Sequence, residues 1–480
     1  MKKLIYTLFF VLISVVANGQ AKYVFYFIGD GMGVNQVNGT EMFQAELQNG
    51  RIGVEPLLFT QFPVATMATT FSATNSVTDS AAAGTALATG KKTYNHAISV
   101  NEEKNAIQTV AEKAKKAGKK VGVTTSVSVD HATPAAFYAH QPDRNMYYEI
   151  ALDLPKANFD FYAGGGFLKP TTTFDNKKAP SIFPIFEEAG YTVARGYNDY
   201  KAKSQNAEKM ILIQEEGANP SCLPYAIDRK DNDLTLAQIT ESAIDFLTKG
   251  KNKGFFLMVE GGKIDWACHA NDAGSTINDT IALADAVEEA VAFAKKHPDD
   301  TLILVTGDHE TGGLTIGYAG TDYNTYLTNL SNQKISYAQF DEQYVENYKA
   351  NKTPFKKAME DVKKEFGLML PGDADAAKNP NLVLTDYEVD KLKTAYQKTL
   401  NMKDGEKLSQ SEYVLYGSYE PFSVTVTHIL NNKSGINFAS YAHTGLPVPV
   451  FAKGLGSSDF EGYYDNTDIY DKMAALLQVK

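Results

Sequence analysis

The chain of 480 residues has only two cysteines, Cys222 and Cys268, and a single tryptophan, Trp266. Two cysteines cannot hold together a small disulfide-rich scaffold, so that class of secreted protein is excluded. We expect both thiols to be small buried side chains, although an oxidising compartment would allow them to pair.

The chain also lacks an excess of positive charge, because 46 Lys and Arg residues face 57 Asp and Glu residues and the formal net charge is −11. A nucleic-acid-binding function, which needs a basic face, is therefore not expected. An anionic substrate is compatible with this balance if bound cations reverse the local field. Apolar residues make up 44% of the chain, which is enough for a sizeable core.

Long apolar runs are missing except near the N-terminus. There, Lys2 and Lys3 precede the apolar run from Leu4 to Val16, and the small residues Ala17 and Gly19 follow. This pattern is typical of a secretory signal peptide, here residues 1–19, and the run is too short to span a bilayer. We expect a protein without a membrane span that is exported to the periplasm or the extracellular space.

No internal repeat is visible, and short apolar runs alternate with helical patterns instead. We expect strands over 23–28, 120–125, 254–259 and 301–305, and helices over 105–116, 234–248 and 275–296. Unbroken apolar strands that alternate with helices predict an α/β fold with a mainly parallel central sheet and helices on both faces.

The composition changes after Tyr318. Residues 321–427 are rich in Lys, Asp, Glu, Asn and Tyr, and apolar strand character returns only at 436–441 and 448–452. We therefore expect a catalytic core formed by 20–320 and 428–480, with 321–427 as a large insertion. This insertion could be a lid, a crown over the active site, a dimerisation element or a solvated helical decoration.

Three predicted strands end at an acidic residue: Asp30, Glu260 and Asp308. Ligands of open α/β sheets bind at the carboxyl ends of strands, so these acids could meet at one edge. Three carboxylates in one place repel one another unless a cation neutralises them. Taken singly, each acid could instead cap a helix or form a turn.

Histidines stand close to these acids in the sequence. Asp265 and His269 are four residues apart, which places both on one face of a helix, and His309 directly follows the third acid. His443 lies just before a predicted strand. Zinc favours such mixed imidazole and carboxylate ligands, whereas Glu260 together with a hydroxyl group favours magnesium.

Ser80 is the candidate nucleophile. It is followed by small residues that predict a helix, and a helix start favours an anion. A serine hydroxyl needs a base or a metal ion to react, and no Gly-x-Ser-x-Gly elbow surrounds Ser80. The alternative is that Asp79 or Ser80 only caps the helix. Arg144 could bind two phosphate oxygens, or it could form a surface ion pair.

Together these segments resemble the alkaline phosphatase family. The segments that carry the resemblance are GDGMG at 29–33, TDSAAAGTA at 78–86, HATP at 131–134 with Arg144, VEGGKID at 259–265 with His269, DHETGG at 308–313 and HTG at 443–445. They follow the family order, and the match runs from about Tyr23 to Gly454 apart from the expected insertion.

The resemblance implies that small phosphate monoesters are hydrolysed to alcohol and inorganic phosphate through a phosphoserine intermediate at Ser80. It implies two zinc ions and a third metal ion, magnesium, and a homodimer, as in many family members. Arg144 would bind the phosphoryl oxygens. The implied ligands are Asp265, His269 and His443 for one zinc, Asp30, Asp308 and His309 for the other, and Asp30, Thr133 and Glu260 for magnesium.

Two positions that vary within the family carry His131 and Trp266 here, next to the expected ligands rather than among them. An imidazole beside the third metal would weaken magnesium binding or favour zinc. Trp266 puts no charge near the phosphate.

Two other functions remain as alternatives. One is a phosphodiesterase on the same metal framework, although Glu260, Thr133 and Arg144 favour a monoester. The other is an exported metal-binding or phosphate-binding protein without turnover, which would need the metal ligands but not Ser80. A sulfatase is disfavoured because alanines follow Ser80 where such enzymes have a Cys/Ser-x-Pro-x-Arg pattern.

Overall fold

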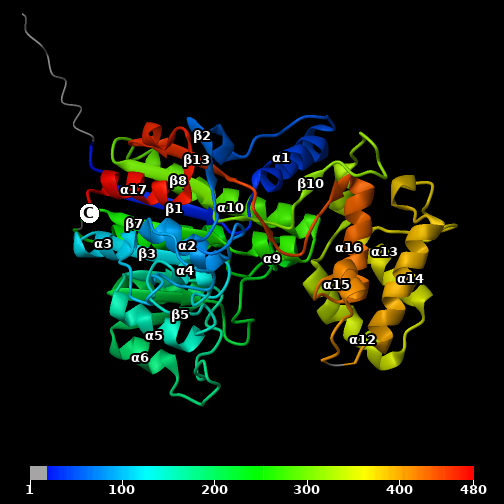
Figure 1. Cartoon of the computed structure of the whole chain (residues 1–480), viewed down its shortest axis with the longest axis horizontal. Coiled ribbons are helices and arrows are strands. Elements are labelled where there is room, and N and C mark those ends of the chain that lie inside the picture. Colours follow the sequence, from blue (N-terminus) through cyan, green and yellow to red (C-terminus); the bar gives the residue numbers. More distant parts are fainter. Residues whose placement is uncertain (1–18, 252, 404, 480) are drawn as a thin grey trace, which may run out of the picture.

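The structure of the chain is a computed structural model that describes residues 19–251, 253–403 and 405–479 (Figure 1). The expected signal peptide lies outside the described residues except for its last one. A ten-stranded sheet forms the centre, in the order β14-β2-β13-β8-β1-β7-β3-β4-β6-β5. Its strands are β1 Tyr23–Gly29, β2 Val64–Thr69, β3 Lys120–Thr125, β4 Phe161–Ala163, β5 Tyr191–Arg195, β6 Lys209–Ile213, β7 Phe255–Gly261, β8 Thr301–Gly307, β13 Val448–Gly454 and β14 Tyr463–Asp465.

The sheet is mainly parallel, as predicted. Strand β13 runs antiparallel to both of its neighbours, β2 and β8, and the other pairings in the sheet are parallel. Two small antiparallel pairs lie outside it, β9 (Glu310–Thr311) with β12 (His443–Thr444) and β10 (Thr315–Ile316) with β11 (Ile436–Asn437).

Both faces of the sheet are covered. Along β1, Phe25 and Phe27 belong to one hydrophobic core, while Val24, Tyr26 and Ile28 belong to the core on the opposite face. This alternation explains why the strand is apolar throughout: each side chain, whichever face it points to, lies beneath helices.

Helices α8 and α10 cover the face of Phe25, and α2, α3 and α17 cover the other face (Figure 1). The α-helices are α1 Val34–Asn49, α2 Ser80–Thr89, α3 Val110–Lys116, α4 Ala132–Ala135, α5 Tyr147–Ala157, α6 Ile182–Glu188, α7 Tyr197–Lys203, α8 Leu236–Thr248, α9 Lys263–His269, α10 Ala273–Ala294, α11 Tyr337–Phe340, α12 Glu346–Asn351, α13 Phe355–Phe366, α14 Asp386–Asn401, α15 Gln410–Tyr416, α16 Pro421–Ser434 and α17 Asn466–Leu477.

Two predicted elements were too long. The helix expected over 105–116 begins only at Val110, because the Thr109 side chain caps it by accepting from the backbone N–H of Glu112. The strand expected over 436–441 is limited to β11, since the chain then turns toward β12 and brings His443 against β9.

Residues 337–434, here called the helical lobe, hold α11 to α16 and lie beyond one end of the sheet, on the right in Figure 1. The lobe has an aromatic interior that includes Phe340, Tyr396 and Phe422. The backbone N–H of Tyr337 joins it to the core by donating to Asp272 Oδ2 at 2.9 Å. The expected boundary at residue 427 falls inside α16, and the insertion itself stays a prediction.

Both cysteines are free and buried, as expected. Among the described residues, no helix combines the length and apolar character that crossing a bilayer requires.

Candidate active site

Three acids meet at the carboxyl edge of the sheet. Strand β1 lies between β7 and β8, and Ile28 is aligned with Glu260 on one side and with Thr306 on the other. Asp30, Glu260 and Asp308 therefore come together and are fully buried. The parallel register, rather than any contact along the chain, produces this convergence.

A second group forms where α9 faces β12. Asp265 and His269 lie one helical turn apart on α9, and His269 Nε2 is 3.4 Å from Asp265 Oδ1. The antiparallel register places His443 opposite Thr311, and its Nε2 lies 3.6 Å from the same oxygen. The spacing of Asp265 and His269 predicted one shared face, and the structure confirms it.

The ring nitrogens of His269 and His443 are arranged as metal ligands. Each Nδ1 faces a backbone carbonyl, that of Tyr441 at 2.6 Å and that of Thr78 at 2.9 Å. A carbonyl only accepts, so each Nδ1 carries the proton and each Nε2 keeps its lone pair. The two Nε2 atoms nevertheless lie 3.1 Å apart. Two facing lone pairs repel, and a cation bound to both removes the repulsion.

His309 shows the same feature in the group with Asp30 and Asp308. Its Nδ1 lies 3.2 Å from the Thr311 hydroxyl, which donates its own proton to Asp265 Oδ1 at 2.5 Å. His309 Nδ1 must therefore donate, and Nε2 keeps a lone pair 3.3 Å from an oxygen of each of the two acids. A ring nitrogen with a free lone pair and two carboxylate oxygens, all facing one another, fit a metal ion.

A third group consists of Asp30, Glu260 and His131, whose ligand atoms lie within 4.8 Å of one another. The Thr133 hydroxyl reaches Asp30 Oδ2 at 3.3 Å, and the Thr125 hydroxyl donates to Glu260. His131, which was expected only beside the metal ligands, thus lies close enough to be one.

Buried polar atoms without a hydrogen-bond partner concentrate here. Among the described residues they include Asp30 Oδ1, Asp308 Oδ2, Glu260 Oε1 and His131 Nδ1. Unsatisfied buried oxygens and nitrogens are costly unless a ligand occupies the space between them. The donor set therefore fits metal ions on an observation independent of the sequence motif.

The electrostatics of the acids lead to the same conclusion. Burial and the carboxylate of Asp308 hold the pKa of Asp30 well above its usual range, and burial raises the pKa of Glu260 to about 7. Burial, with Arg144 nearby, lowers the pKa of His131 to about 3, so its ring stays neutral. A bound cation would let these acids ionise at neutral pH.

Ser80 is the first residue of α2 and is almost fully buried. Its hydroxyl lies 3.1 Å from His309 Nε2. Asp79, not Ser80, caps the helix, because its Oδ1 accepts from the N–H of Ala82 at 3.0 Å. Its Oδ2 accepts from Arg144 Nη1 at 3.1 Å, so one carboxylate orients both the helix start and the guanidinium group.

These groups open into one pocket of about 310 Å³. It is lined by Ser80, His131, Arg144, Asp265, Trp266, His269, Tyr337, Tyr419 and His443. Asp30, Thr133, Glu260, Asp308 and His309 are buried and complete the three ligand groups. The structure thus brings every sequence-predicted site residue into one region.

Sequence reasoning missed Tyr337 and Tyr419, because they come from the helical lobe and belong to no motif. Thr311 and Glu310 stood inside the DHETGG segment but had no assigned role. The Glu310 carboxylate is buried and accepts from Gln36 Nε2, from the backbone N–H groups of Gly313 and Leu314, and from the Thr444 hydroxyl. It therefore ties the turn that follows His309 to the strand that carries His443.

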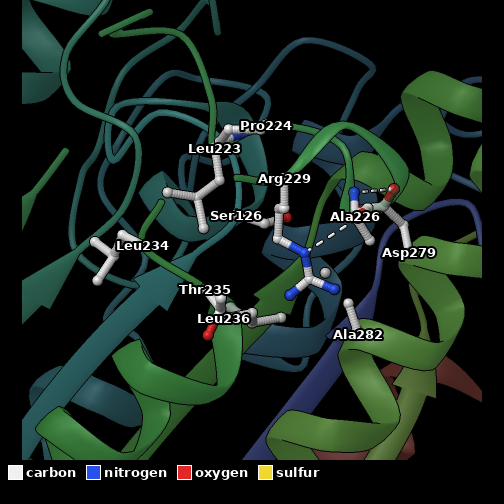
Figure 2. A pocket seen from close by; sticks show the side chains of 11 residues that line it. Ser126, Leu223, Pro224, Ala226, Arg229, Leu234, Thr235, Leu236, Asp279 and Ala282 are labelled. Carbon is white, nitrogen blue, oxygen red and sulfur yellow. Dashed lines mark hydrogen bonds between the residues drawn. The ribbon is translucent and has the colours of Figure 1, made fainter. Parts of the chain in front are cut away.

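Figure 2 shows a different pocket, beside Arg229 and Asp279. The backbone of Ala226 forms hydrogen bonds with both side chains: its N–H donates to Asp279 Oδ2 at 3.2 Å, and its carbonyl accepts from Arg229 Nε at 3.3 Å. The cavity holds about 20 Å³, room for roughly one water molecule. This pocket is too small and too well satisfied for a substrate.

The fold and the ligand groups define a metal-dependent α/β enzyme with its centre at the carboxyl edge of the sheet. The family model "Alkaline phosphatase" matches residues 21–160 and 199–479. The chain is 33% identical over 455 residues to alkaline phosphatase 4 of Bacillus subtilis, covering 93% of this chain and 86% of the relative.

Solved structures agree with this assignment. A cold-active alkaline phosphatase from Shewanella sp. has a TM-score of 0.76 at 30% identity, covering 95% of this chain and 99% of the other. The alkaline phosphatase of Thermus thermophilus has a TM-score of 0.77 at 26% identity, covering 96% and 92%. The chain belongs to the alkaline phosphatase family, and it is a phosphomonoesterase.

We expect Glu310→Gln to lower the free energy of unfolding by about 1–3 kcal/mol and to weaken metal retention, because the amide would place a donor against groups that already donate. Urea unfolding and metal content after dialysis measure both effects. Glu461→Gln, at an exposed position, is the matched control. Unchanged stability and metal content in Glu310→Gln would contradict the role given to the Glu310 carboxylate.

Proposed function

We propose that this phosphomonoesterase works by transferring the phosphoryl group first to Ser80 and then to water, with two zinc ions and a third metal ion. The observation that carries the proposal is that the Ser80 hydroxyl lies 3.1 Å from His309 Nε2. The same nitrogen, which keeps its lone pair, also faces carboxylate oxygens of Asp30 and Asp308. The proposed nucleophile is therefore next to one of the groups that could hold a metal ion.

The three groups of side chains would each hold one ion. Zinc suits the two groups with histidines and carboxylates, and the third suits magnesium or zinc. When bound, the ions supply positive charge that favours the ionised form of a nearby hydroxyl or water and offsets charge on the phosphoryl oxygens. The proposed ligands are Asp265, His269 and His443 for the first zinc, Asp30, Asp308 and His309 for the second, and Asp30, Thr133 and Glu260, with His131 beside them, for the third ion.

In the first step the Ser80 oxygen loses its proton and forms a bond to phosphorus, while the bond from phosphorus to the ester oxygen breaks and that oxygen takes up a proton, so that the alcohol is released. Ser80 is held for this step at the start of α2, where backbone N–H groups and the helix dipole favour a phosphoryl group. In the second step a water molecule loses a proton and its oxygen forms a bond to the same phosphorus, while the bond from phosphorus to the Ser80 oxygen breaks and that oxygen takes up a proton, so that inorganic phosphate is released.

Arg144 would bind two oxygens of the phosphoryl group. Its guanidinium lines the pocket and is oriented by Asp79, so it needs little reordering when the substrate arrives. A fixed, planar, charged donor pair fits the non-bridging oxygens of a monoester. This arrangement disfavours a phosphodiesterase, because a monoester has three non-bridging oxygens and a diester only two, so with two oxygens on Arg144 only a monoester keeps a third for the metal ions.

The identity of the third ion depends on His131. A variant of the TAB5 alkaline phosphatase in which aspartate replaces a histidine has been solved with magnesium in its M3 site. In this chain a ring nitrogen of His131 lies within the third group, and the buried Nδ1 of the same ring has no hydrogen-bond partner among the described residues. Because imidazole suits zinc better than magnesium, we propose that zinc competes for this group.

Export also belongs to the proposal, and it rests on the signal-like pattern of residues 1–19. The homodimer stays a prediction from the family resemblance. A non-catalytic binding protein would not need a buried serine hydroxyl against a ligand histidine, so that alternative is not favoured.

Ser80→Ala should lower kcat for an aryl phosphate by about 10³-fold or more, since the nucleophile is lost, while zinc content stays unchanged. Steady-state kinetics and elemental analysis of the same sample measure both. Ser76→Ala, an exposed serine in the same segment, should behave like the wild type. Near-normal turnover by Ser80→Ala would rule out the phosphoserine route.

A matched pair of substrates separates monoesterase from diesterase activity. We expect kcat/KM for 4-nitrophenyl phosphate to exceed that for methyl 4-nitrophenyl phosphate by at least about 100-fold, because the diester loses charge-assisted bonds to Arg144 and the metal ions. A chelator should abolish both activities, and zinc with magnesium should restore them. Equal values for the two substrates would favour the phosphodiesterase alternative.

His131→Asp should raise the affinity for magnesium by about tenfold, because a carboxylate oxygen replaces an imidazole nitrogen. Magnesium titration followed by calorimetry on zinc-loaded protein measures this without reference to activity. His96→Asp adds the same charge at an exposed position and is the control. An unchanged magnesium affinity in His131→Asp would show that residue 131 does not influence the third ion.

A further inference from the structure

We propose that Trp266, Tyr337 and Tyr419, here called the aromatic wall, form a binding site for the leaving alcohol and favour phosphate monoesters whose alcohol carries an aromatic ring close to the ester oxygen. Benzyl-type esters, in which a single methylene group separates the ring from the ester oxygen, have this chemistry. The inference rests on the proposed function of the same pocket and adds the substrate class.

The aromatic wall consists of the pocket-lining residues that have no proposed role in binding the phosphoryl group or the metal ions. Of the side chains around the pocket, Ser80 and Arg144 address the phosphoryl group, and the histidines and Asp265 belong to the ligand groups. The lining residues that remain are the three aromatic ones. A group attached to the ester oxygen therefore meets aromatic rings when it leaves the metal-ligand end of the pocket.

Two parts of the fold supply these rings. Trp266 lies on α9 between Asp265 and His269, whereas Tyr337 and Tyr419 come from the helical lobe. All three are only half-buried, so each leaves part of its ring accessible. The helical lobe thus contributes to the pocket without supplying any of the proposed metal ligands.

The rings of the aromatic wall pack edge-to-face against neighbouring rings. Tyr337 and Tyr419 lie 5.5 Å apart between centroids at an interplanar angle of 87°. Trp266 and His131 lie 5.7 Å apart at 71°. This edge-to-face geometry comes from the aromatic quadrupole, and a further ring can be accepted by the same interaction, whereas a saturated ring of similar size cannot.

The wall is held in place before any substrate binds. The buried ammonium group of Lys263 lies 4.9 Å from the centroid of Trp266 and 3.4 Å from that of Tyr225. The hydroxyl group of Tyr225 is in turn 3.4 Å from that of Tyr337, whose backbone N–H is bound to Asp272. Rings fixed in this way lose little entropy when a ligand binds, so little of the binding free energy from their contact with an aromatic ring is lost to ordering them.

The test compares benzyl phosphate with cyclohexylmethyl phosphate, two esters of primary alcohols that differ in the aromaticity of the ring. The measured quantity is the ratio of their kcat/KM values. We expect Tyr419→Leu to lower this ratio by about three- to tenfold relative to wild type, and Tyr419→Phe to keep it. Because both substrates are assayed on one sample, any unfolded fraction cancels from the ratio.

Tyr323→Leu is the matched control, since Tyr323 is 97% exposed and does not line the pocket. Calorimetric binding of benzylphosphonate and cyclohexylmethylphosphonate, which cannot be hydrolysed at the P–C bond, gives the same comparison without turnover. Here too the preference for the aromatic compound should fall in Tyr419→Leu.

An unchanged ratio in Tyr419→Leu, in both kinetics and binding, would overturn the aromatic wall while leaving the proposed phosphoryl transfer through Ser80 intact. An equal fall in Tyr323→Leu would overturn it as well, because the effect would then not come from the pocket. If the wild type hydrolysed neither ester but bound both phosphonates with the same preference, the proposed function would fail and the wall would stand as a binding site.

Discussion

Repulsion between like groups at the carboxyl edge of the sheet is the constraint on which the rest of this structure depends. Asp30, Glu260 and Asp308 are fully buried at adjoining strand ends, and unprotonated nitrogens of His269 and His443 face each other at 3.1 Å. Such an arrangement is unstable by itself in a low-dielectric interior. Bound cations would convert each repulsive contact into a pair of ligands, so that metal binding and folding would stabilise each other.

The surrounding structure fixes the histidine nitrogens that the metal ions would use. Backbone carbonyls of Thr78 and Tyr441 hold two of the rings, and the hydroxyl of Thr311 holds the third. The carbonyl of Thr78 also links His443 to the segment just before Ser80. The stretch of chain that carries Ser80 therefore also orients His443, so the proposed nucleophile and this proposed ligand would need little reorganisation during catalysis.

The sheet edge and the helical lobe contribute different properties to the pocket. The strand ends, α2 and α9 provide charge, the proposed nucleophile and the proposed metal ligands, which would suit any phosphate monoester. The lobe provides Tyr337 and Tyr419, which would act on the alcohol part of the substrate. The hydrogen bond from the Tyr337 backbone N–H to Asp272, at the start of α10, helps to hold the lobe in position against the core.

The alternation of strands and helices, the placement of acids after strands, and pairs set by local spacing, such as Asp265 with His269, could all be predicted from the amino-acid sequence. These depend on the period of the backbone and on residues a few positions apart, so they can be recognised without coordinates. Family resemblance then supplied roles for distant residues such as His443 and Arg144.

Contacts between distant segments could not be predicted in this way, because they depend on how the whole chain packs. His131 reaches the third ligand group, Asp79 rather than Ser80 caps α2, and Glu310 joins two turns, because side chains from separate elements meet there. Tyr337 and Tyr419 reach the pocket from a lobe whose sequence has surface-like composition and no motif. Sequence spacing fixes which groups a local segment presents, whereas packing fixes which groups from other segments they meet.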